Sequence, residues 1–237
     1  MMWTRYATAA EYCAGKDVLE VGCGSAQGLG HIAAHAHYVV GGDYTCDLVE
    51  AASRHYGSRV RFACLDGQRL PFRDRSFDVV ILYEAIYYLA DPEAFVAECC
   101  RVLRAGGSVL ICSANREWAG FNPSPFSYRY YSARELGALL ERAGFRVQLF
   151  GAFPDSAESL VRQLVGLIRR IAVALHLIPK TMSGKALLKR LFYGKLVVLG
   201  HELTEGMANV APLVPLDGAT ATRDFKVVYA IGVLPAM

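Results

Sequence analysis

Residues 18–28 constrain the fold of this 237-residue chain more than any other stretch. A short apolar run precedes Gly22, Gly24 and Gly28, and a segment of helical length follows. This order predicts a buried strand, a tight turn and a helix, residues 26–36, that begins near Ser25. Glycines let the backbone turn sharply and let a ligand come close, and a helix N-terminus favours a negative group. The stretch therefore predicts a site for a nucleotide-like cofactor.

The glycine spacing separates two kinds of nucleotide-binding loop. Dinucleotide loops follow the pattern G-x-G-x-x-G, which requires glycine where this chain has Gln27. Glu20 is also unusual at the end of a buried strand. The segment from Glu20 to Gly24 resembles the first motif of class I S-adenosylmethionine-dependent methyltransferases. The resemblance implies that the loop backbone holds the methionine part of the cofactor, and that Glu20 orients the loop close to the methionyl amine.

Two further acids follow predicted strands. Asp43 ends a second apolar run, and a carboxylate there can accept both hydroxyl protons of a ribose. The alternative is an aspartate that serves a turn or caps a helix. Tyr44 would lie beside an adenine ring, on which an aromatic face can stack. Asp66 ends a third strand, and the resemblance implies that it accepts a hydrogen bond from the adenine amino group.

Longer patterns make the resemblance more specific. Asp66 is followed by Leu-Pro-Phe at residues 70–72 and by Ser-Phe-Asp at residues 76–78, and residues 101–107 read Arg-Val-Leu-Arg-Ala-Gly-Gly. Both patterns are typical of these methyltransferases, above all of the group that includes the ubiquinone and menaquinone methyltransferases. The match spans about residues 17–113. It implies a Rossmann-like α/β fold, with a seven-stranded, mostly parallel sheet, an antiparallel last strand and helices on both faces.

The segment after the fourth predicted strand points to the second substrate. Ligands of open α/β sheets bind beyond the carboxyl ends of the strands, so residues 83–92 are expected to face the methyl group. Many relatives carry Glu-His or His-His where this chain has Tyr87 and Tyr88, which argues against a histidine base. A tyrosine can position an acceptor hydroxyl or cover a sulfonium. The alternative is that one or both tyrosines pack a helix against the sheet. Residues 114–131, rich in aromatics, are expected to form another wall of the acceptor pocket.

These inferences predict two sets of residues. The cofactor set is Glu20, Gly22, Cys23, Gly24, Gly28, Asp43, Tyr44, Asp66, Gly67 and Tyr83, and the acceptor set is Glu84, Tyr87 and Tyr88. Arg5 and Tyr6, in a predicted N-terminal helix, are further candidates for contacting the carboxylate of the cofactor. His31 and His35 share a helix face but lack the Glu or Cys that would support a zinc site, and no metal is predicted.

The connection between the last two predicted strands, about 70 residues long, has a one-sided charge. Residues 159–201 contain eight Lys or Arg and no Asp or Glu, which leaves 17 basic and 22 acidic residues elsewhere. We expect residues 155–222 to form a helical insertion within a single methyltransferase domain, residues 1–237. Two interpretations stay open. Either the insertion is a cap with solvated basic residues, or it meets an anionic membrane surface, substrate or carrier.

Composition limits the remaining choices. A net charge of +3 does not by itself indicate nucleic acid, and no run of about 18 uncharged apolar residues predicts a membrane span. Seven cysteines without C-x-x-C spacing, and no apparent signal peptide, indicate a cytoplasmic protein with reduced thiols.

The predicted reaction is transfer of a methyl group from S-adenosylmethionine to an oxygen, nitrogen or carbon of a small-molecule or lipid-like acceptor. S-adenosylhomocysteine is the second product. One alternative is a nicotinamide-dependent oxidoreductase, against which Gln27 argues. The other is a non-catalytic relative that binds the cofactor without turning it over.

Overall fold

The computed structural model describes residues 1–154, 200–217 and 222–236. The chain divides into two units, of which the first is Met1–Pro154 with His201–Met237 and the second is Asp155–Gly200. All the elements described here belong to the first unit. The predicted insertion, residues 155–222, lies outside the described residues except for residues 200–217 and Thr222, and these contain a short strand and no helix.

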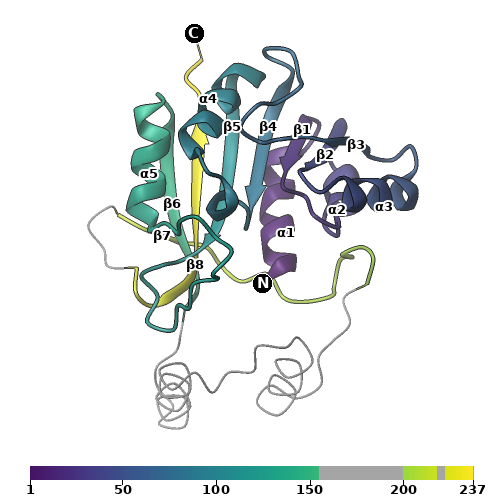
Figure 1. Ribbon diagram of the computed structural model, residues 1–237. Coiled ribbons are helices and arrows are strands. Elements are labelled where there is room, and N and C mark those ends of the chain that lie inside the picture. The colour runs from purple at the N-terminus through teal and green to yellow at the C-terminus, as the bar shows by residue number, and fades with distance from the viewer. Residues whose placement is uncertain (155–199, 218–221, 237) are drawn as a thin grey trace. The chain divides into compact units, whose positions relative to one another are not determined.

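In the described part of the chain, eight strands form one mixed sheet in the order β3-β2-β1-β4-β5-β8-β6-β7 (Figure 1). Strands β1 to β5 run parallel, and β8 is inserted antiparallel between β5 and β6. This arrangement confirms the predicted fold class, and the two-residue β7 is an addition at the edge. The bounds are Asp17–Val21 for β1, Tyr38–Asp43 for β2, Arg61–Cys64 for β3, Phe77–Tyr83 for β4, Leu103–Ala114 for β5, Arg146–Pro154 for β6, Val214–Pro215 for β7 and Phe225–Val233 for β8.

Helices cover both faces of the sheet, as predicted. Helices α1 to α3 pack on one face and α4 and α5 on the other, and each face has its own apolar core. Strand residues alternate between the two cores: Ile81 of β4 belongs to the first and Leu82 to the second, because successive side chains point to opposite faces. The bounds are Met2–Cys13 for α1, Leu29–Ala33 for α2, Cys46–Tyr56 for α3, Pro92–Val102 for α4, Ala133–Arg142 for α5 and Ile86–Tyr88 for the 3-10 turn η1.

The helix after the glycine turn is shorter than predicted. Residues 26–36 were expected to be helical, but α2 spans only five residues. Ala26 has a φ of 58°, in the left-handed region, so it cannot belong to a right-handed helix. Turns replace the expected first helical turn, with the N–H of Leu29 donating to the carbonyl of Ala26. The predicted helix start near Ser25 was therefore wrong, and the loop itself rather than a long helix forms this part of the site.

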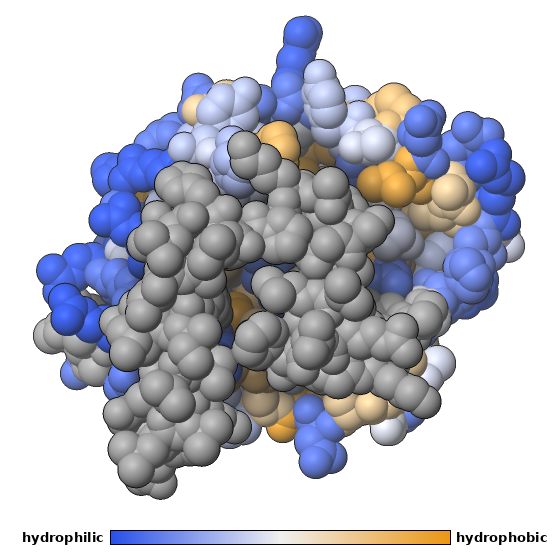
Figure 2. Space-filling model, turned by 60° about the horizontal axis from the view of Figure 1, so that its bottom comes forward, coloured by the Kyte–Doolittle hydropathy of each residue, from blue (hydrophilic) through white to orange (hydrophobic). Residues whose placement is uncertain are grey.

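The surface of the described residues is mixed in hydropathy. Hydrophobic residues stand among hydrophilic ones on the visible described part of the face in Figure 2. Phe126 and Tyr128, which follow β5, are 84% and 73% exposed. Within residues 1–154, 200–217 and 222–236, no helix combines the length and the apolar character needed to span a membrane.

Gly28 allows α1 to approach the start of α2. A Cβ on Gly28 would lie 2.2 Å from the ring of Tyr6, which is far below van der Waals contact. We predict that Gly28→Ala lowers the free energy of unfolding by about 1–3 kcal/mol, the usual effect of overpacking a core. Urea denaturation would measure this change. In a Tyr6→Ala background, the same glycine substitution should have little further effect, and additive losses in the double variant would contradict the explanation.

Candidate active site

Parallel pairing brings the predicted site residues to one edge of the sheet. Val21 of β1 is paired with Gly42 of β2, and Asp43 of β2 is paired with Cys64 of β3. Glu20 and Asp43 thus lie at the carboxyl ends of neighbouring strands, and Asp66 follows β3 by two residues. Ligands of open α/β sheets bind at this edge, so the structure places these acids where a ligand is expected.

The glycine turn is fastened to the end of β2. The N–H groups of Gly22 and Cys23 both donate to the carbonyl of Gly42, at 2.8 and 3.0 Å. Gly22 and Gly24 have φ values of 72° and 53°, which favour glycine. A Cβ on Gly22 would lie 2.6 Å from Ala85, whereas a Cβ on Gly24 would meet no atom within 4 Å among the described residues, its chain neighbours apart. The turn is therefore packed at Gly22 and open at Gly24, where a ligand could approach the backbone.

Two other members of the predicted cofactor set have a packing role in the structure. Gly28 makes room for the ring of Tyr6, as described above. Cys23 is buried, and burial raises the pKa of its thiol well above the ordinary value, so it is no nucleophile. Neither observation assigns these two residues to a ligand.

Asp43 is held by the turn and by the start of α3. Its Oδ2 accepts from the N–H of Gly24 at 2.7 Å, and its Oδ1 accepts from the N–H of Thr45 at 2.8 Å. Thr45, rather than Asp43, is the N-cap residue of α3. Each carboxylate oxygen can accept more than one hydrogen bond, so both retain capacity for the hydroxyls of a ribose.

Glu20 is a buried carboxylate with one oxygen unpaired. Glu20 is 1% exposed, and its Oε1 accepts a hydrogen bond from the hydroxyl of Tyr6 at 2.7 Å. Oε2 has no partner among the described residues. Burial raises the pKa of Glu20 to about 7, the Tyr6 hydrogen bond opposes that rise, and the nearby charge of Asp43 adds to it. A buried acid with a free oxygen fits a cationic group such as the amine of the predicted cofactor.

The residues predicted for the adenine end are less enclosed. Oδ1 of Asp66 accepts from the backbone N–H and the side-chain amide of Gln68, at 2.9 and 3.1 Å. Gly67 is buried, and a Cβ there would lie 2.9 Å from Val21 of β1. Tyr44 is 80% exposed. Its place beside an adenine ring stays a prediction.

Glu84 joins helix α1, which is distant in sequence, to the adjacent turn η1. Oε1 of Glu84 accepts from the guanidinium of Arg5 on α1 at 2.6 Å, and Oε2 accepts from the hydroxyl of Tyr87 at 2.9 Å. Glu84 also has a φ of 54°, a strained conformation of the kind that clusters at functional sites. Burial and the charge of Glu84 raise the pKa of Tyr87 well above its ordinary value, so Tyr87 acts as a hydrogen-bond donor here.

Sequence reasoning placed Arg5 near the cofactor carboxylate and did not find its pairing with Glu84. The two residues are 79 positions apart, and only the docking of α1 onto the sheet brings them together. Nε of Arg5 is buried and has no hydrogen-bond partner in residues 1–154, 200–217 and 222–236, and the same holds for the hydroxyl of Tyr229 on β8. Tyr229 was not predicted either, because its position in the chain reads as an ordinary core strand residue.

The aromatic residues after β5 do meet the acceptor set. The ring of Tyr87 stacks on Tyr130 with centroids 4.6 Å apart, and Phe121 meets Tyr130 edge-on at 4.7 Å. Tyr88 is 52% exposed and contacts Tyr87 edge-on. The ring of Tyr87 is thus packed and its hydroxyl donates to Glu84, while the predicted role of Tyr87 and Tyr88 toward an acceptor stays a prediction.

Tyr83, the last predicted cofactor residue, ends β4 inside the core. It is 6% exposed, meets Tyr6 and Tyr229 edge-on at 5.8 and 6.3 Å, and its hydroxyl has no partner within the described part of the chain. Burial raises the pKa of this hydroxyl well above its usual range. A direct contact with a cofactor stays a prediction.

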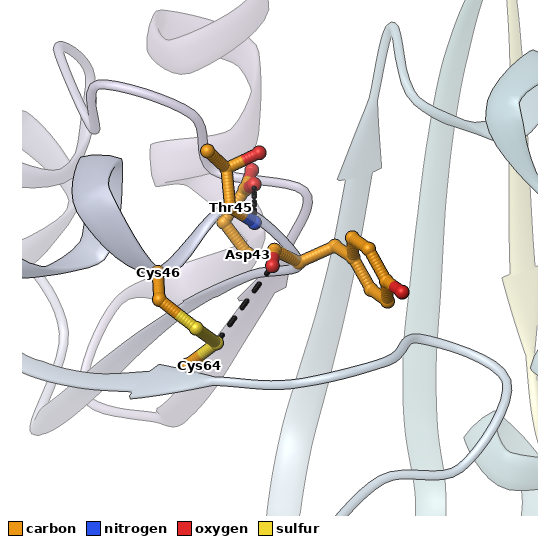
Figure 3. The surroundings of a disulfide bond; sticks show 5 residues. Asp43, Thr45, Cys46 and Cys64 are labelled. Atoms are coloured by element: carbon orange, nitrogen blue, oxygen red, sulfur yellow. Dashed lines mark hydrogen bonds between the residues drawn. A yellow bond between two sulfur atoms is a disulfide. The ribbon is translucent and has the colours of Figure 1, made fainter.

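A disulfide lies beside the adenosine end of the candidate site (Figure 3). It joins Cys46, the first residue of α3, to Cys64, the last residue of β3. The prediction of reduced thiols was wrong for this pair. The two cysteines are 18 residues apart, and they meet because Asp43 pairs with Cys64 and α3 begins three residues after Asp43. Cys13, Cys23, Cys99, Cys100 and Cys112 are free.

Comparison with known proteins shows what this chain is similar to. Residues 19–111 match the model of a family described as a methyltransferase domain. A probable S-adenosylmethionine-dependent methyltransferase of Mycolicibacterium smegmatis is 42% identical over 154 residues, which are 60% of this chain and 57% of that protein. A malonyl-[acyl-carrier protein] O-methyltransferase of Hahella chejuensis is 29% identical over 196 residues, 74% of this chain and 67% of that protein.

A solved structure has a similar fold. The [4+2]-cyclase SpnF superposes with a TM-score of 0.65 at 20% identity, over 98% of this chain and 80% of that one. This likeness concerns the fold alone. The family match and the curated relatives go further: residues 19–111 match a methyltransferase domain, and the chain is similar to S-adenosylmethionine-dependent methyltransferases, of which it spans little more than half the length in the Mycolicibacterium relative.

Proposed function

We propose that this chain transfers the methyl group of S-adenosylmethionine to a small-molecule or lipid-like acceptor, through oxygen, nitrogen or carbon. The observation that carries the proposal is the meeting of Glu20, Asp43 and Asp66 with the open turn at Gly24 along one edge of the sheet. The Hahella relative is named as an O-methyltransferase, which makes oxygen the first acceptor atom to test.

Each acid has a part in holding the cofactor. Glu20 offers its free oxygen to the methionyl amine, and the turn around Gly24 lies along the methionine chain. Asp43, already aligned by Gly24 and Thr45, accepts from the ribose hydroxyls. Asp66 and Tyr44 serve the adenine. When bound, S-adenosylmethionine supplies a methyl group on a positively charged sulfonium.

The acceptor side is organised around Glu84. Arg5 and Tyr87 fix its carboxylate from two directions, and each oxygen keeps a lone pair that can take a hydrogen bond from an acceptor group. Aromatic residues around Tyr87 offer ring faces and edges that suit a hydrophobic or planar acceptor. Holding two reactants at near-attack distance contributes ~7–11 kcal/mol in favourable cases, so the chain needs no strong base.

Two other functions are testable alternatives. A nicotinamide-dependent oxidoreductase is disfavoured by Gln27 and by the family match. A relative that binds the cofactor without methyl transfer shares the acids of the cofactor site, and SpnF, whose structure is described as a [4+2]-cyclase, illustrates another reaction on a similar fold. Binding and turnover must therefore be measured separately.

We predict that Asp43→Asn weakens the binding of S-adenosylhomocysteine about ten- to a hundredfold, because hydrogen bonds to a charged group contribute about 1.5–3 kcal/mol. Isothermal titration calorimetry measures the affinity, and transfer of labelled methyl groups to metabolite and lipid extracts measures turnover. Asp47→Asn, an exposed acid in the first turn of α3, is the matched control. Wild-type affinity in a folded Asp43→Asn variant would rule out the assigned site, and binding without turnover would favour the non-catalytic alternative.

The raised pKa of Glu20 makes stability depend on pH. Because this pKa lies at about 7 in the fold, against an ordinary value near 4.5, the native state holds a proton that the unfolded state releases. The free energy of unfolding should therefore fall as the pH rises from 4.5 to 7, by on the order of 3 kcal/mol. Urea denaturation across this range should show the fall in wild type and in Glu11→Gln, an exposed control. If the fall in the free energy of unfolding were as large in Glu20→Gln, another group would have to be responsible for it.

The proton on Glu20 should also make the affinity for the cofactor depend on pH. A methyl donor whose amine lies beside Glu20 favours the carboxylate, so binding near pH 7 should release a proton and tighten as the pH rises from 6 to 7. Calorimetry of S-adenosylhomocysteine in two buffers of different ionisation enthalpy counts the released proton. If Glu20→Gln released as many protons on binding as the wild type, the group that titrates would not be Glu20.

We also propose that residues 159–201 bring the protein to an anionic membrane surface. Eight basic and no acidic residues support the proposal. The protein should float with vesicles containing anionic lipid at low salt, and it should be released at about 0.5 M salt, where charges are screened. Vesicles of neutral lipid are the control. Failure to float with anionic vesicles at low salt would exclude the membrane and leave the helical cap as the better interpretation.

A further inference from the structure

The Cys46–Cys64 disulfide crosses the two segments that carry the adenosine end of the candidate site. One segment runs from Asp43 at the end of β2 to Cys46 at the start of α3. The other runs from Cys64 at the end of β3 to Asp66. The Cα atoms of the two cysteines are 5.1 Å apart, an ordinary separation for a disulfide. A single covalent bond therefore connects the backbone segments of both acids.

We propose that this disulfide is a reversible redox site, reduced by dithiols, that sets how tightly the adenosine half of the cofactor binds. This proposal rests on the proposed function, since it concerns the affinity of the same site. Its chemical partner is a small or protein dithiol.

Exposure distinguishes this pair from most of the other cysteines. Cys46 and Cys64 are both exposed in the described structure, so a dithiol can reach them. Cys13, Cys23, Cys99 and Cys112 are buried, and burial raises the pKa of each of these thiols, which keeps them unreactive. Only Cys100 is free and partly exposed among the described cysteines, and it lies on α4, on the opposite face of the sheet.

Reduction of the disulfide proceeds by thiol–disulfide exchange, in which the dithiol supplies the two electrons. One thiolate of the dithiol attacks a sulfur of the Cys46–Cys64 bond, the S–S bond breaks, and a mixed disulfide forms. The second thiolate of the dithiol then displaces the remaining cysteine. The reagent ends as a disulfide, having given two electrons, and Cys46 and Cys64 take up two protons as free thiols.

The bond is linked to Asp43 by short contacts. The N–H of Thr45 donates to Oδ1 of Asp43 at 2.8 Å, one residue before Cys46, and the N–H of Leu65 donates to the carbonyl of Asp43 at 2.9 Å, one residue after Cys64 (Figure 3 shows the first of these). Sγ of Cys64 lies 3.7 Å from the carbonyl oxygen of Tyr44. Breaking the bond frees the start of α3, and with it the backbone that aligns the Asp43 carboxylate.

The direction of the effect follows from preorganisation. With the disulfide intact, the segments that bear Asp43 and Asp66 are already ordered before the ligand arrives. After reduction, binding must order them, and this lost entropy weakens affinity. We expect reduction to raise the dissociation constant of S-adenosylhomocysteine about three- to tenfold, an effect comparable with fixing one or two side chains or loop residues.

The test compares one protein in two redox states. Full-length protein is treated with an oxidant or with dithiothreitol, and alkylation with mass spectrometry establishes the state of Cys46 and Cys64. Circular dichroism confirms that both forms are folded at the temperature of the titration. Calorimetry with S-adenosylhomocysteine should then give weaker binding for the reduced form, and reoxidation should restore the affinity.

Two variants make the result specific. Cys46→Ser combined with Cys64→Ser should bind like the reduced wild type and should not respond to dithiothreitol, whereas Cys100→Ser should keep the full response. Equal affinity of folded oxidised and reduced protein would overturn the proposal and leave the disulfide a structural bond. Failure of the oxidant to join these two cysteines would overturn it as well. Absence of binding in both forms would instead count against the proposed function.

Discussion

Parallel pairing of β1 with β2 on one side and β4 on the other is the constraint on which the site depends. In a parallel sheet all carboxyl ends face the same edge, so residues that are far apart in sequence become neighbours there. Glu20, Asp43 and Glu84 each come at or directly after the end of one of these strands. The hydrogen bond from Gly24 to Asp43 and the electrostatic influence of Asp43 on Glu20 are consequences of this arrangement.

Several local features that are unfavourable for stability lie at this edge. In the described part of the chain, one oxygen of the buried Glu20 and the buried Nε of Arg5 have no hydrogen-bond partner, and Glu84 and Ala26 have left-handed backbones. A fold tolerates such features when the surrounding structure determines them strongly. Two apolar cores, one on each face of the sheet, supply that support. Because such features cluster at functional sites, their position at the carboxyl edge supports the proposed site.

Much of the fold followed from local patterns. The strand ending in Asp43 was predicted from an apolar run, and the antiparallel last strand, β8, was implied by the family resemblance. Local residues also explain the start of α5, where Ser132 and Glu135 form a capping box. The short α2 was missed because its length depends on the left-handed backbone of Ala26, which no residue preference at that position signals. The roles of Tyr44, Asp66 and Tyr83 toward a ligand stay predictions, since the structure shows only their positions and protein contacts.

The amino-acid sequence alone determined the order of strands and helices, the glycine turn and the acids at strand ends, because these depend on residues close together in the chain. Tertiary structure alone decided which distant groups meet. Arg5 reaches Glu84 across 79 residues, Tyr6 reaches the buried Glu20, and Cys46 reaches Cys64 through the register of β2 with β3. The physical reason is that these contacts depend on how helices dock and how strands align. Docking and alignment depend on residues from distant parts of the chain, so no single stretch of sequence predicts them.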